Sequence, residues 1–350
     1  MNPKLSIIVP VYRAENTLEK CLDSLLAQPY RDMEIVLVED ASPDASGKLC
    51  DAYAQKYDCI KVLHKEHGGP THTRKAGLAA ASGDYISFVD SDDYVEPEMF
   101  EVMMQKITET DADICIYGIV VDIDGKRTPM YGDMPEGLYD KTRLKQEVYP
   151  EMLFSEALQN PLITPSLCNK IFRKDIIEPV LSTADDSIFY GEDAACTYPC
   201  MLDAQRVYIL QKRYFYVYRQ TRKSITKSYD KRLLEKILTL VDVLDKECSK
   251  RQYDVSVQLD NYTAVQLLFA VRSELLHNKE LPLAGRVKKL KAYLSEPRFE
   301  RVYETVRNGN LGKKVKTKIR LVEKKHLYLL FLLCFFKEKV LQLKGHYHEG

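Results

Sequence analysis

Up to residue 121 of this 350-residue chain, short apolar runs alternate with amphipathic stretches, and this alternation constrains the fold more than any other feature. Runs such as 5–9 (LSIIV) predict buried strands, and stretches such as 17–27 predict helices that bury one face. The alternation is typical of a mostly parallel sheet covered by helices on both faces. Strands are predicted at 5–9, 34–38, 60–63, 85–89 and 114–121, and helices at 17–27, 46–57, 73–81 and 98–108.

The pattern then changes twice. Residues 122–165 are irregular, with one helix predicted around 144–158, whereas the last third of the chain carries long helical patterns. We therefore expect a mixed α/β domain over 1–228, a helical region over 229–311, and a basic, then apolar tail over 312–350. Short elements are predicted at 167–172 and 176–177, further strands at 207–210 and 213–218, and further helices at 191–202, 231–250, 259–277 and 285–294.

The charges balance overall but not along the chain. The sequence has 51 Lys and Arg against 51 Asp and Glu, which disfavours a disordered or nucleic-acid-binding chain, so no nucleic-acid partner is expected. From Gly312 onward there are ten basic and three acidic residues, a net charge of +7, which leaves −7 for the body. The chain is thus an acidic body with a basic tail.

Cysteine usage and the N-terminal sequence bear on the compartment. Nine cysteines, an odd number without a repeated spacing, favour reduced thiols in the cytoplasm. Cys196 and Cys200 have no matching second pair, which disfavours a zinc site. Because the first apolar run is interrupted at Pro10 and no small-residue cleavage site follows, no signal peptide is expected.

Polar residues follow the predicted strands at their carboxyl ends, where parallel α/β sheets bind their ligands. Asp90 and Asp92 come directly after the strand at 85–89, and two carboxylates so close repel each other unless a cation or hydrogen-bond donors compensate. Mg²⁺ and Mn²⁺ are typically held by one or two carboxylates together with substrate phosphates. We therefore predict a divalent cation here. The alternative, that Asp92 or Asp93 only caps the next helix, explains one acidic residue but not three.

Two other strand ends carry weaker signals. Asp40 could accept hydrogen bonds from a uracil N–H or from ribose hydroxyls, although residues 40–44 are also rich in turn formers. The sequence His67-Gly68-Gly69 on its own indicates a turn, but with Arg74 on the following helix it could close over a diphosphate. The alternative for Arg74 is a solvated helix charge.

Taken in order, these motifs resemble those of family 2 glycosyltransferases with the GT-A fold, of the type that builds bacterial surface polysaccharides. The resemblance covers residues 3–228 and implies a Rossmann-like, mostly parallel sheet sandwiched by helices, followed here by a helical C-terminal region. The matching segments are 6–28, 34–46, 67–97, 169–177, 191–199 and 216–226.

The resemblance implies an inverting transfer of a hexosyl or N-acetylhexosaminyl group from a nucleotide diphosphate, usually that of uridine. The acceptor is a hydroxyl of a glycan or lipid-linked glycan, and Mn²⁺ or Mg²⁺ binds the diphosphate. Asp92 is then the direct metal ligand, and Asp90 contacts the ribose or a metal-bound water. The other implied donor contacts are Pro10, Tyr12 (stacked on the base), Glu15, Asp40, Arg74, Ser91 and Asp93.

Asp193 resembles the catalytic base of the family, with Glu192 as the fallback. Single displacement also requires, on chemical grounds, a base on the face opposite the leaving diphosphate, hence from a segment other than the metal-binding loop. The alternative is that both carboxylates only stabilise a helix N-terminus through its dipole. Arg219, Arg222 and Lys223 are predicted to neutralise the leaving diphosphate, the alternative being a solvated loop.

The tail has a cluster of basic residues followed by the ten-residue apolar run 327–336, shorter than the ~20 residues that a membrane-spanning helix needs. Such a segment fits peripheral contact of residues 312–344 with the anionic inner face of the cell membrane. The alternative is a helix buried in the core or in a homo-oligomer.

Two other functions compete with sugar transfer. A nucleotidyltransferase that makes sugar nucleotides has a similar sheet, but it needs a glycine-rich basic loop directly after the first strand, where this chain has Pro10-Val11-Tyr12. A glycan-binding or scaffold protein without catalysis is disfavoured because Asp90, Asp92 and Asp193 are all present.

Overall fold

The computed structural model describes residues 3–130, 134–220 and 229–343, and these fall into two compact units. The first unit comprises residues 1–150 and 163–220, and the second comprises residues 151–162 and 221–350. The sequence did not indicate that the short segment 151–162 belongs with the C-terminal helices. The expected domain boundaries at 228 and 311 stay predictions, and residue 228 lies outside the described residues.

The first unit is built on one twisted sheet. Its described strands are β1 (Leu5–Val11), β2 (Met33–Glu39), β3 (Ile60–His64), β4 (Tyr85–Phe88), β5 (Tyr94–Val95), β6 (Ile114–Ile123), β7 (Lys126–Met130), β8 (Gly137–Asp140), β9 (Lys170–Arg173) and β10 (Arg206–Arg219). They are ordered β3-β2-β1-β4-β9-β6-β10-β5, with β7 beside β6 and β8 beside β10. The block β3-β2-β1-β4 is parallel, as is the pair β6-β10, whereas β9 runs antiparallel between the two.

The strands predicted up to residue 121 are confirmed, with ends that differ by at most two residues. In the central strands β1 and β2 most side chains on both faces are apolar and buried: Ile7 lies in register with Ile35 on one face, and Ile8 with Val36 on the other. A parallel strand that is covered on both faces favours such a continuous apolar run. The two strands predicted at 207–210 and 213–218 are in fact one strand, β10, whose pairing with β6 is irregular between Ile209 and Tyr214.

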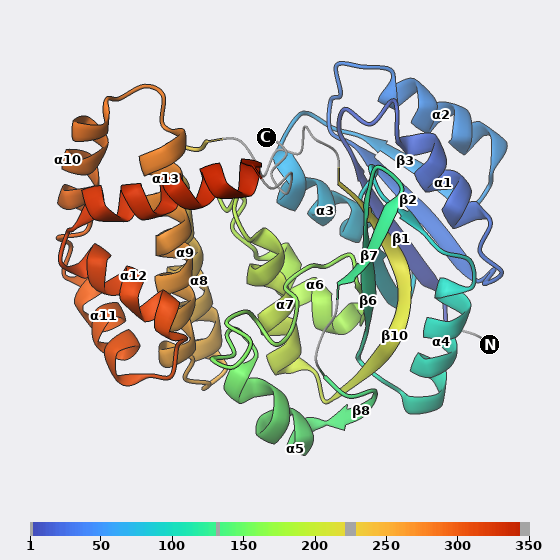
Figure 1. The fold of residues 1–350 in the computed structure, drawn as a ribbon. Helices are drawn as coiled ribbons and strands as arrows, with labels where there is room; N and C mark the ends of the chain where they lie inside the picture. Colours follow the sequence, from blue (N-terminus) through green and yellow to red (C-terminus); the bar gives the residue numbers. More distant parts are fainter. Residues whose placement is uncertain (1–2, 131–133, 221–228, 344–350) are drawn as a thin grey trace. The chain divides into compact units, whose positions relative to one another are not determined.

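Helices cover both faces of this sheet (Figure 1). One face carries α1 (Leu18–Leu26), α2 (Ser46–Lys56) and α4 (Met99–Thr110), and the other carries α3 (Gly69–Ala80), α6 (Lys174–Ser182) and α7 (Glu192–Asp203). Helix α3 lies very close to the sheet because Gly77 has no side chain. A Cβ atom there would collide with Ile8 of β1 and come within 3.1 Å of Val38 of β2.

The helix predicted over 144–158 is confirmed only in its first half, as irregular helical turns, and is wrong in its second half. The structure has α5 (Lys141–Arg143), a π-helical turn at Leu144–Val148 and a 3-10 turn at Tyr149–Glu151, and nothing helical follows before residue 158. Pro150 explains the break, since it offers no backbone N–H to a continuing helix and its ring clashes with the preceding turn.

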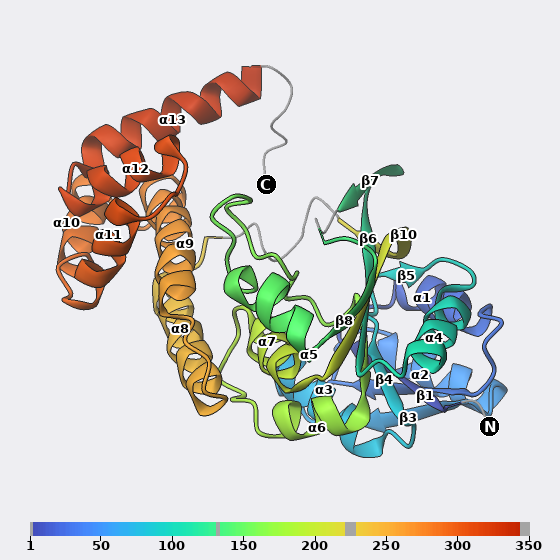
Figure 2. The same cartoon turned by 90° about the horizontal axis from the view of Figure 1, so that it is seen from below.

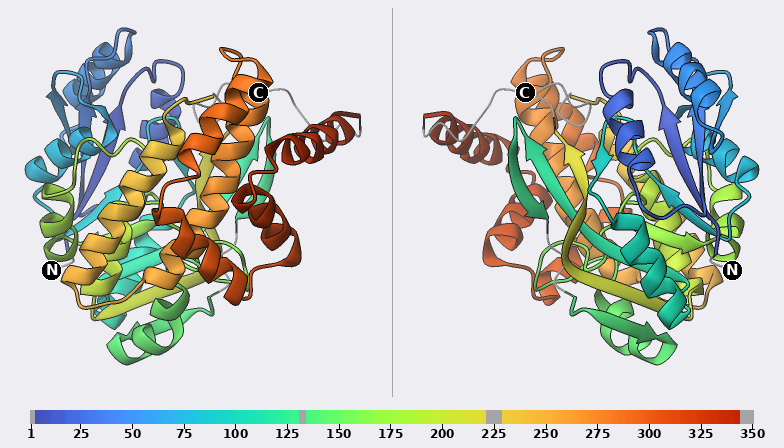
Figure 3. Two further views of the ribbon diagram at one scale, coloured as in Figure 1. Left: turned by 90° about the vertical axis from the view of Figure 1, so that its left-hand side faces the viewer. Right: turned by 90° about the vertical axis from the view of Figure 1, so that its right-hand side faces the viewer.

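The second unit is helical. Its helices are α8 (Leu233–Lys250), α9 (Ser256–His277), α10 (Leu283–Tyr293), α11 (Arg298–Asn308), α12 (Lys313–Glu323) and α13 (Leu327–Leu343). The helices predicted at 231–250, 259–277 and 285–294 are confirmed as α8, α9 and α10. Figures 2 and 3 show α13 as the outermost helix of this unit. Among the described residues, no helix has the combined length and hydrophobicity to cross a membrane.

Candidate active site

The loops after β1, β2 and β4 lie at one edge of the sheet, because these strands are neighbours and run in the same direction. In an open α/β sheet this carboxyl edge is where ligands bind. Side-chain contacts bring the start of α7 and the end of β10 to the same edge. The predicted site residues that the structure describes come from six separate stretches of sequence and gather at this edge.

The acidic loop after β4 is anchored by Asp93. This side chain is fully buried, and its carboxylate accepts hydrogen bonds from the Tyr216 hydroxyl at 2.7 Å and from the Arg219 N–H at 2.8 Å. Burial, reinforced by the charges of Asp90 and Asp92, raises the pKa of Asp93 to about 8. The Arg219 side chain donates to the backbone oxygens of Asp92 and Thr17, so the loop is fixed from both sides. Asp93 thus positions the loop from beneath, while the Asp92 side chain is exposed.

Arg74 lies at the centre of the site. It is buried in α3, and its guanidinium group forms ion pairs with Asp90 at 3.2 Å, Asp193 at 3.1 Å and Glu192 at 3.5 Å. The alternative that Arg74 is a solvated helix charge is therefore wrong. Burial and the surrounding carboxylates raise the pKa of both Asp90 and Glu192, although Arg74 opposes the shift. Three carboxylates around one guanidinium leave a net charge of −2.

Asp193 lies in the first turn of α7, which starts directly after Gly191, a glycine with φ of 71°. One carboxylate oxygen accepts a hydrogen bond from the Leu167 N–H at 3.1 Å. The other oxygen faces Arg74 and, like the Nε of Arg74, is buried without a hydrogen-bond partner among the described residues. The helix dipole alone does not account for this arrangement, because Asp193 is bound by groups from two other segments.

A buried lysine holds the segment that contacts Asp193. The Lys170 ammonium group is fully buried and donates to the backbone oxygens of Thr164 and Ser166 and to Oδ1 of Asn169, at 2.6 to 2.7 Å. Burial lowers the pKa of Lys170 to about 7, but the three acceptors match the three N–H bonds of its charged form. Thr197 of α7 donates to the Pro165 oxygen at 2.6 Å. Segment 164–169 is thereby held beside the start of α7.

Asp40, at the end of β2, organises the loop that leads into α3. Its buried carboxylate accepts hydrogen bonds from the backbone N–H groups of Gly68 at 2.9 Å and Gly69 at 3.0 Å, and it pairs with Lys65 and His67. Although burial opposes the shift, these donors lower the pKa of Asp40. In this structure the carboxylate is thus occupied by protein groups, and its predicted contact with a nucleoside stays a prediction.

Tyr12 presents an exposed aromatic face next to Asp40. Its ring is 41% exposed and stacks on the His67 ring at a centroid distance of 4.6 Å, with Arg13 on it at 5.3 Å. Such a face can stack on a planar base. The remaining predicted donor contacts are placed as follows: Pro10 is half-buried, Glu15 accepts from the Ala45 N–H, Ser91 is buried, and Arg222 and Lys223 lie outside the described residues.

The residues present fit a divalent cation that binds together with a diphosphate. The described residues contain no preformed cluster of three or more His, Cys, Asp or Glu that could hold a metal ion. Asp90 and Asp92 can supply two carboxylates, which is what Mg²⁺ or Mn²⁺ usually takes from the protein when substrate phosphates complete the shell. The net negative charge around Arg74 and the raised pKa of Asp90 also favour a cation here.

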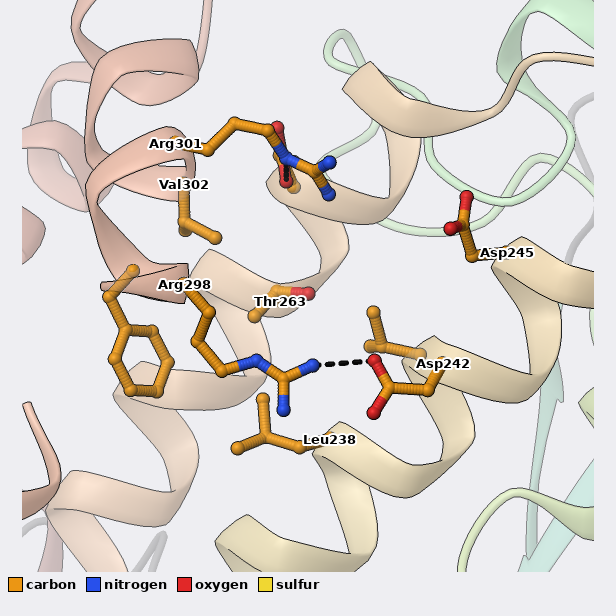
Figure 4. A pocket seen from close by; sticks show the side chains of 10 residues that line it. Leu238, Asp242, Asp245, Thr263, Arg298, Arg301 and Val302 are labelled. Carbon is orange, nitrogen blue, oxygen red and sulfur yellow. Dashed lines mark hydrogen bonds and ion pairs between the residues drawn. The ribbon is translucent and has the colours of Figure 1, made fainter. Parts of the chain in front are cut away.

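The helical unit has a separate pocket of about 310 Å³ between α8, α9 and α11 (Figure 4). Its two arginines are already paired: Arg298 contacts Asp242 at 2.5 Å, and Arg301 contacts Asp260 at 3.0 Å. The pocket therefore differs from the acidic edge of the sheet, where carboxylates outnumber the cation that they share.

The sequence did not single out three residues that contribute to the candidate site: Lys65, Lys170 and Tyr216. Lys170 could have been noticed because it lies within the predicted short element 167–172, next to apolar residues. A lysine that is buried there must find hydrogen-bond acceptors. Lys65 and Tyr216 carry no comparable signal, since a lysine after a strand and a tyrosine within one are both ordinary.

The order of the strands and the acidic segments at the carboxyl edge agree with the class of protein that the sequence motifs resemble, the GT-A glycosyltransferases. The family described as "Glycosyl transferase family 2" matches residues 6–181, which is half of the chain. The chain therefore belongs to glycosyl transferase family 2.

Similar proteins support this assignment. The uncharacterized glycosyltransferase EpsJ of Bacillus subtilis is 32% identical over 65% of this chain and 64% of its own length. Glycosyltransferase GlyA of Streptococcus pneumoniae is 28% identical over 70% of this chain, and the putative glycosyltransferase EpsH of Bacillus subtilis is 31% identical over 69%. The chain covers less than two thirds of EpsJ and only 34% of GlyA.

A solved structure confirms the fold. The crystal structure of residues 1–349 of S. aureus TarS covers 99% of this chain and 93% of that chain, with a TM-score of 0.63 and 19% identity. The complex of the same fragment with UDP-GlcNAc matches with a TM-score of 0.64. The predicted GT-A fold with a helical C-terminal region is therefore correct.

Proposed function

We propose that this protein is an inverting glycosyltransferase that moves a sugar from a nucleotide diphosphate donor, most simply a UDP-sugar, to a hydroxyl group of a glycan or lipid-linked glycan. The observation that carries the proposal is the Arg74 guanidinium group, which is 3.2 Å from Asp90 and 3.1 Å from Asp193. One carboxylate follows β4 and the other begins α7. A single displacement requires a base beside the attacking hydroxyl, and a carboxylate from a separate segment can hold a cation beside the leaving diphosphate.

In the proposed reaction Asp193 is the base. Its Oδ1 atom, which has no hydrogen-bond partner among the described residues, accepts the proton of the acceptor hydroxyl as that oxygen attacks the anomeric carbon. The bond from the anomeric carbon to the diphosphate breaks at the same time, and its electrons leave with the nucleotide diphosphate. The Leu167 N–H keeps the second oxygen of Asp193 in place, so the carboxylate does not have to reorganise during the transfer.

Asp90 and Asp92 would hold a divalent cation on the diphosphate. When bound, Mn²⁺ or Mg²⁺ supplies positive charge that stabilises the leaving diphosphate. Arg219 approaches from β10 and is fixed at the Asp92 backbone, where a guanidinium group can add to that stabilisation. Arg222 and Lys223, outside the described residues, are proposed for the same task. The exposed ring of Tyr12 would stack on the base, next to Asp40 and Glu15.

The choice of donor and acceptor draws on proteins of related sequence or fold. TarS, whose fold this chain shares, has been solved with UDP and with UDP-GlcNAc, which supports a uridine donor. A poly(ribitol-phosphate) β-glucosyltransferase of Bacillus spizizenii is 27% identical over 65% of this chain, which supports an acceptor in a surface polysaccharide. The predicted cytoplasmic location at the inner face of the membrane stays a prediction, as does the predicted homo-oligomer. Neither follows from the residues proposed to bind the donor.

A panel of nucleotide sugars tests the proposal. We expect the purified protein to hydrolyse at least one UDP-sugar slowly in the absence of acceptor, since water can replace the hydroxyl, and to do so only with Mn²⁺ or Mg²⁺ present. Release of UDP measures the reaction, and addition of EDTA should abolish it until excess metal is restored. The proposal fails if no nucleotide sugar is either bound or hydrolysed with metal, or if EDTA leaves turnover unchanged.

Replacing Lys170 by Met should lower kcat by about 100-fold while the KM for the donor stays within about threefold, because a base displaced by ~1 Å loses its alignment. The variant leaves three buried acceptors unpaired, so its thermal unfolding must be measured alongside. Thr197→Val, which only removes the bond to the Pro165 oxygen, should shift kcat in the same direction by less.

Thr110→Val is the matched control for these two variants. It removes the hydrogen bond from the Thr110 hydroxyl to the Lys106 backbone oxygen within α4, which is the same kind of bond that Thr197→Val removes. Because Thr110 is far from Asp193 in sequence, this variant should leave kcat unchanged. If Lys170→Met and Thr197→Val both fold and keep the wild-type kcat, segment 164–169 does not position the base.

A further inference from the structure

Helix α13 has an apolar face that the described residues of the helical unit leave exposed. Its 17 residues run LYLLFLLCFFKEKVLQL, and only some of the apolar ones are buried. Leu327, Leu330 and Cys334 belong to the core of the unit, together with Ile319 and Val322 of α12. The expectation of a buried core helix is thus correct for one side of α13. The exposed apolar side chains are Tyr328, Leu329, Leu332, Leu333, Phe335, Phe336 and Val340, each between 38% and 62% exposed.

These seven side chains form one continuous surface, which we call the α13 apolar face. At 3.6 residues per turn they fall within an arc of roughly 160°, opposite the arc that holds Leu327, Leu330 and Cys334. The inner side is fixed to α9 through the ion pair of Glu338 with Arg272, so the helix cannot turn its apolar face inward without breaking core contacts. An exposed apolar patch of this kind usually marks an interaction surface.

Positive charges flank the α13 apolar face at both ends. Lys324 precedes it and is exposed, and the exposed Lys337 and Lys339 lie in the last turns of the helix. Lys339 lies inside the arc, with its ammonium group 5.9 Å from the centre of the Phe335 ring. Two copies of this face packed by a twofold axis would bring the same ammonium groups together. An anionic surface, in contrast, pairs with them while the apolar side chains leave water.

We propose that the α13 apolar face docks the protein on a bilayer that contains anionic phospholipid, with the helix axis parallel to the membrane surface. Phe336 and Leu333 enter the boundary between headgroups and acyl chains, while Lys337 and Lys339 reach the phosphates. Because one side of α13 stays packed on its own unit, the contact is interfacial. The proposal is independent of the chemistry at Asp193 and adds a partner surface to the proposed function.

Co-sedimentation of the full-length protein with vesicles tests the proposal. We expect binding to phosphatidylcholine vesicles that contain phosphatidylglycerol, and binding at least ~10-fold weaker to pure phosphatidylcholine or at high salt. Phe336→Glu should weaken binding by at least ~10-fold, since an aromatic ring proposed to enter the bilayer is replaced by a charge. Val257→Glu on α9 is the matched control: Val257 is 58% exposed and Phe336 62%, but only Phe336 belongs to the face.

Point variants are preferable to removal of the tail, because α12 and α13 supply part of the core of the unit. Phe336→Glu should keep the wild-type unfolding temperature, which shows that lost binding is not lost folding. Absence of binding to both vesicle types would overturn the proposal, as would equal binding by Phe336→Glu. If the wild-type protein instead self-associates with rising concentration, and Phe336→Glu is monomeric, the face belongs to a second copy of the chain and not to a membrane.

Discussion

Asp193→Asn should abolish sugar transfer, with kcat reduced by at least about 1,000-fold, while the dissociation constant of the nucleotide donor stays within about threefold. The amide cannot take up the proton of the acceptor hydroxyl, but it has nearly the shape of the carboxylate and can still accept from the Leu167 N–H. Asp193 faces Arg74 and not the exposed ring of Tyr12, so the stacking of the donor's nucleobase on Tyr12 should be unaffected. Steady-state kinetics and calorimetry with UDP measure the two effects.

Two further variants make this result specific. Asp175→Asn removes an exposed carboxylate of α6 that pairs with Arg173 at 2.7 Å, and it should leave kcat unchanged. Glu192→Gln tests the neighbouring carboxylate, which also contacts Arg74. A larger loss of kcat in Glu192→Gln than in Asp193→Asn would transfer the role of base to Glu192. A donor affinity reduced in proportion to kcat in Asp193→Asn would contradict a role in proton transfer alone.

Asp92→Ala should weaken metal-dependent donor binding by at least about 100-fold and reduce turnover at least as much. Residues that only hydrogen-bond to a metal ligand already cost ~10–100-fold in metal affinity when they are replaced, and the loss of a direct ligand should cost more. The fold should persist, since the Asp92 side chain is exposed and its backbone oxygen still accepts from Arg219. Calorimetry with UDP and Mn²⁺, and again with UDP and EDTA, separates metal-dependent from metal-independent binding.

Asp58→Ala provides the control for this variant. Asp58 is an exposed aspartate in the turn before β3, and its loss should change neither donor binding nor its dependence on metal. If Asp92→Ala binds UDP as the wild type does in both buffers, Asp92 is not a metal ligand. Together the two substitutions divide the site: Asp92 is expected to affect binding and turnover, whereas Asp193 is expected to affect turnover alone.

The sheet was predictable from local pattern because its central strands are apolar on both faces. In the run 5–9 four of the five residues are apolar, and the one polar residue, Ser6, is buried and donates to Glu34, so the run is stable as a buried strand. The prediction was wrong where a single residue overrides a local preference, as Pro150 does by ending a helical turn. It was incomplete at β9, since the position of an antiparallel strand between β4 and β6 depends on long-range pairing.

The site was predictable in its residues but not in its connections. The sequence singles out Asp90, Asp92, Asp193 and Arg74 as candidates, because they follow strand ends or begin helices at the edge where such sheets bind ligands. It does not indicate that Arg74 is buried between Asp90 and Asp193, or that Asp93 lies beneath the loop, bonded to Tyr216. The contacts of Arg74 with Asp193 and of Asp93 with Tyr216 join residues more than 100 positions apart, and no local pattern encodes them.

The tail shows the same division. By itself the sequence determined the composition of the last helix, an apolar run with basic residues before and after it, and this composition suits both a buried helix and a membrane surface. Only the tertiary structure decided which side chains of α13 pack against α9 and α12 and which remain exposed. The physical reason is that hydrophobicity is a property of each residue, whereas burial depends on which neighbours the fold brings to it.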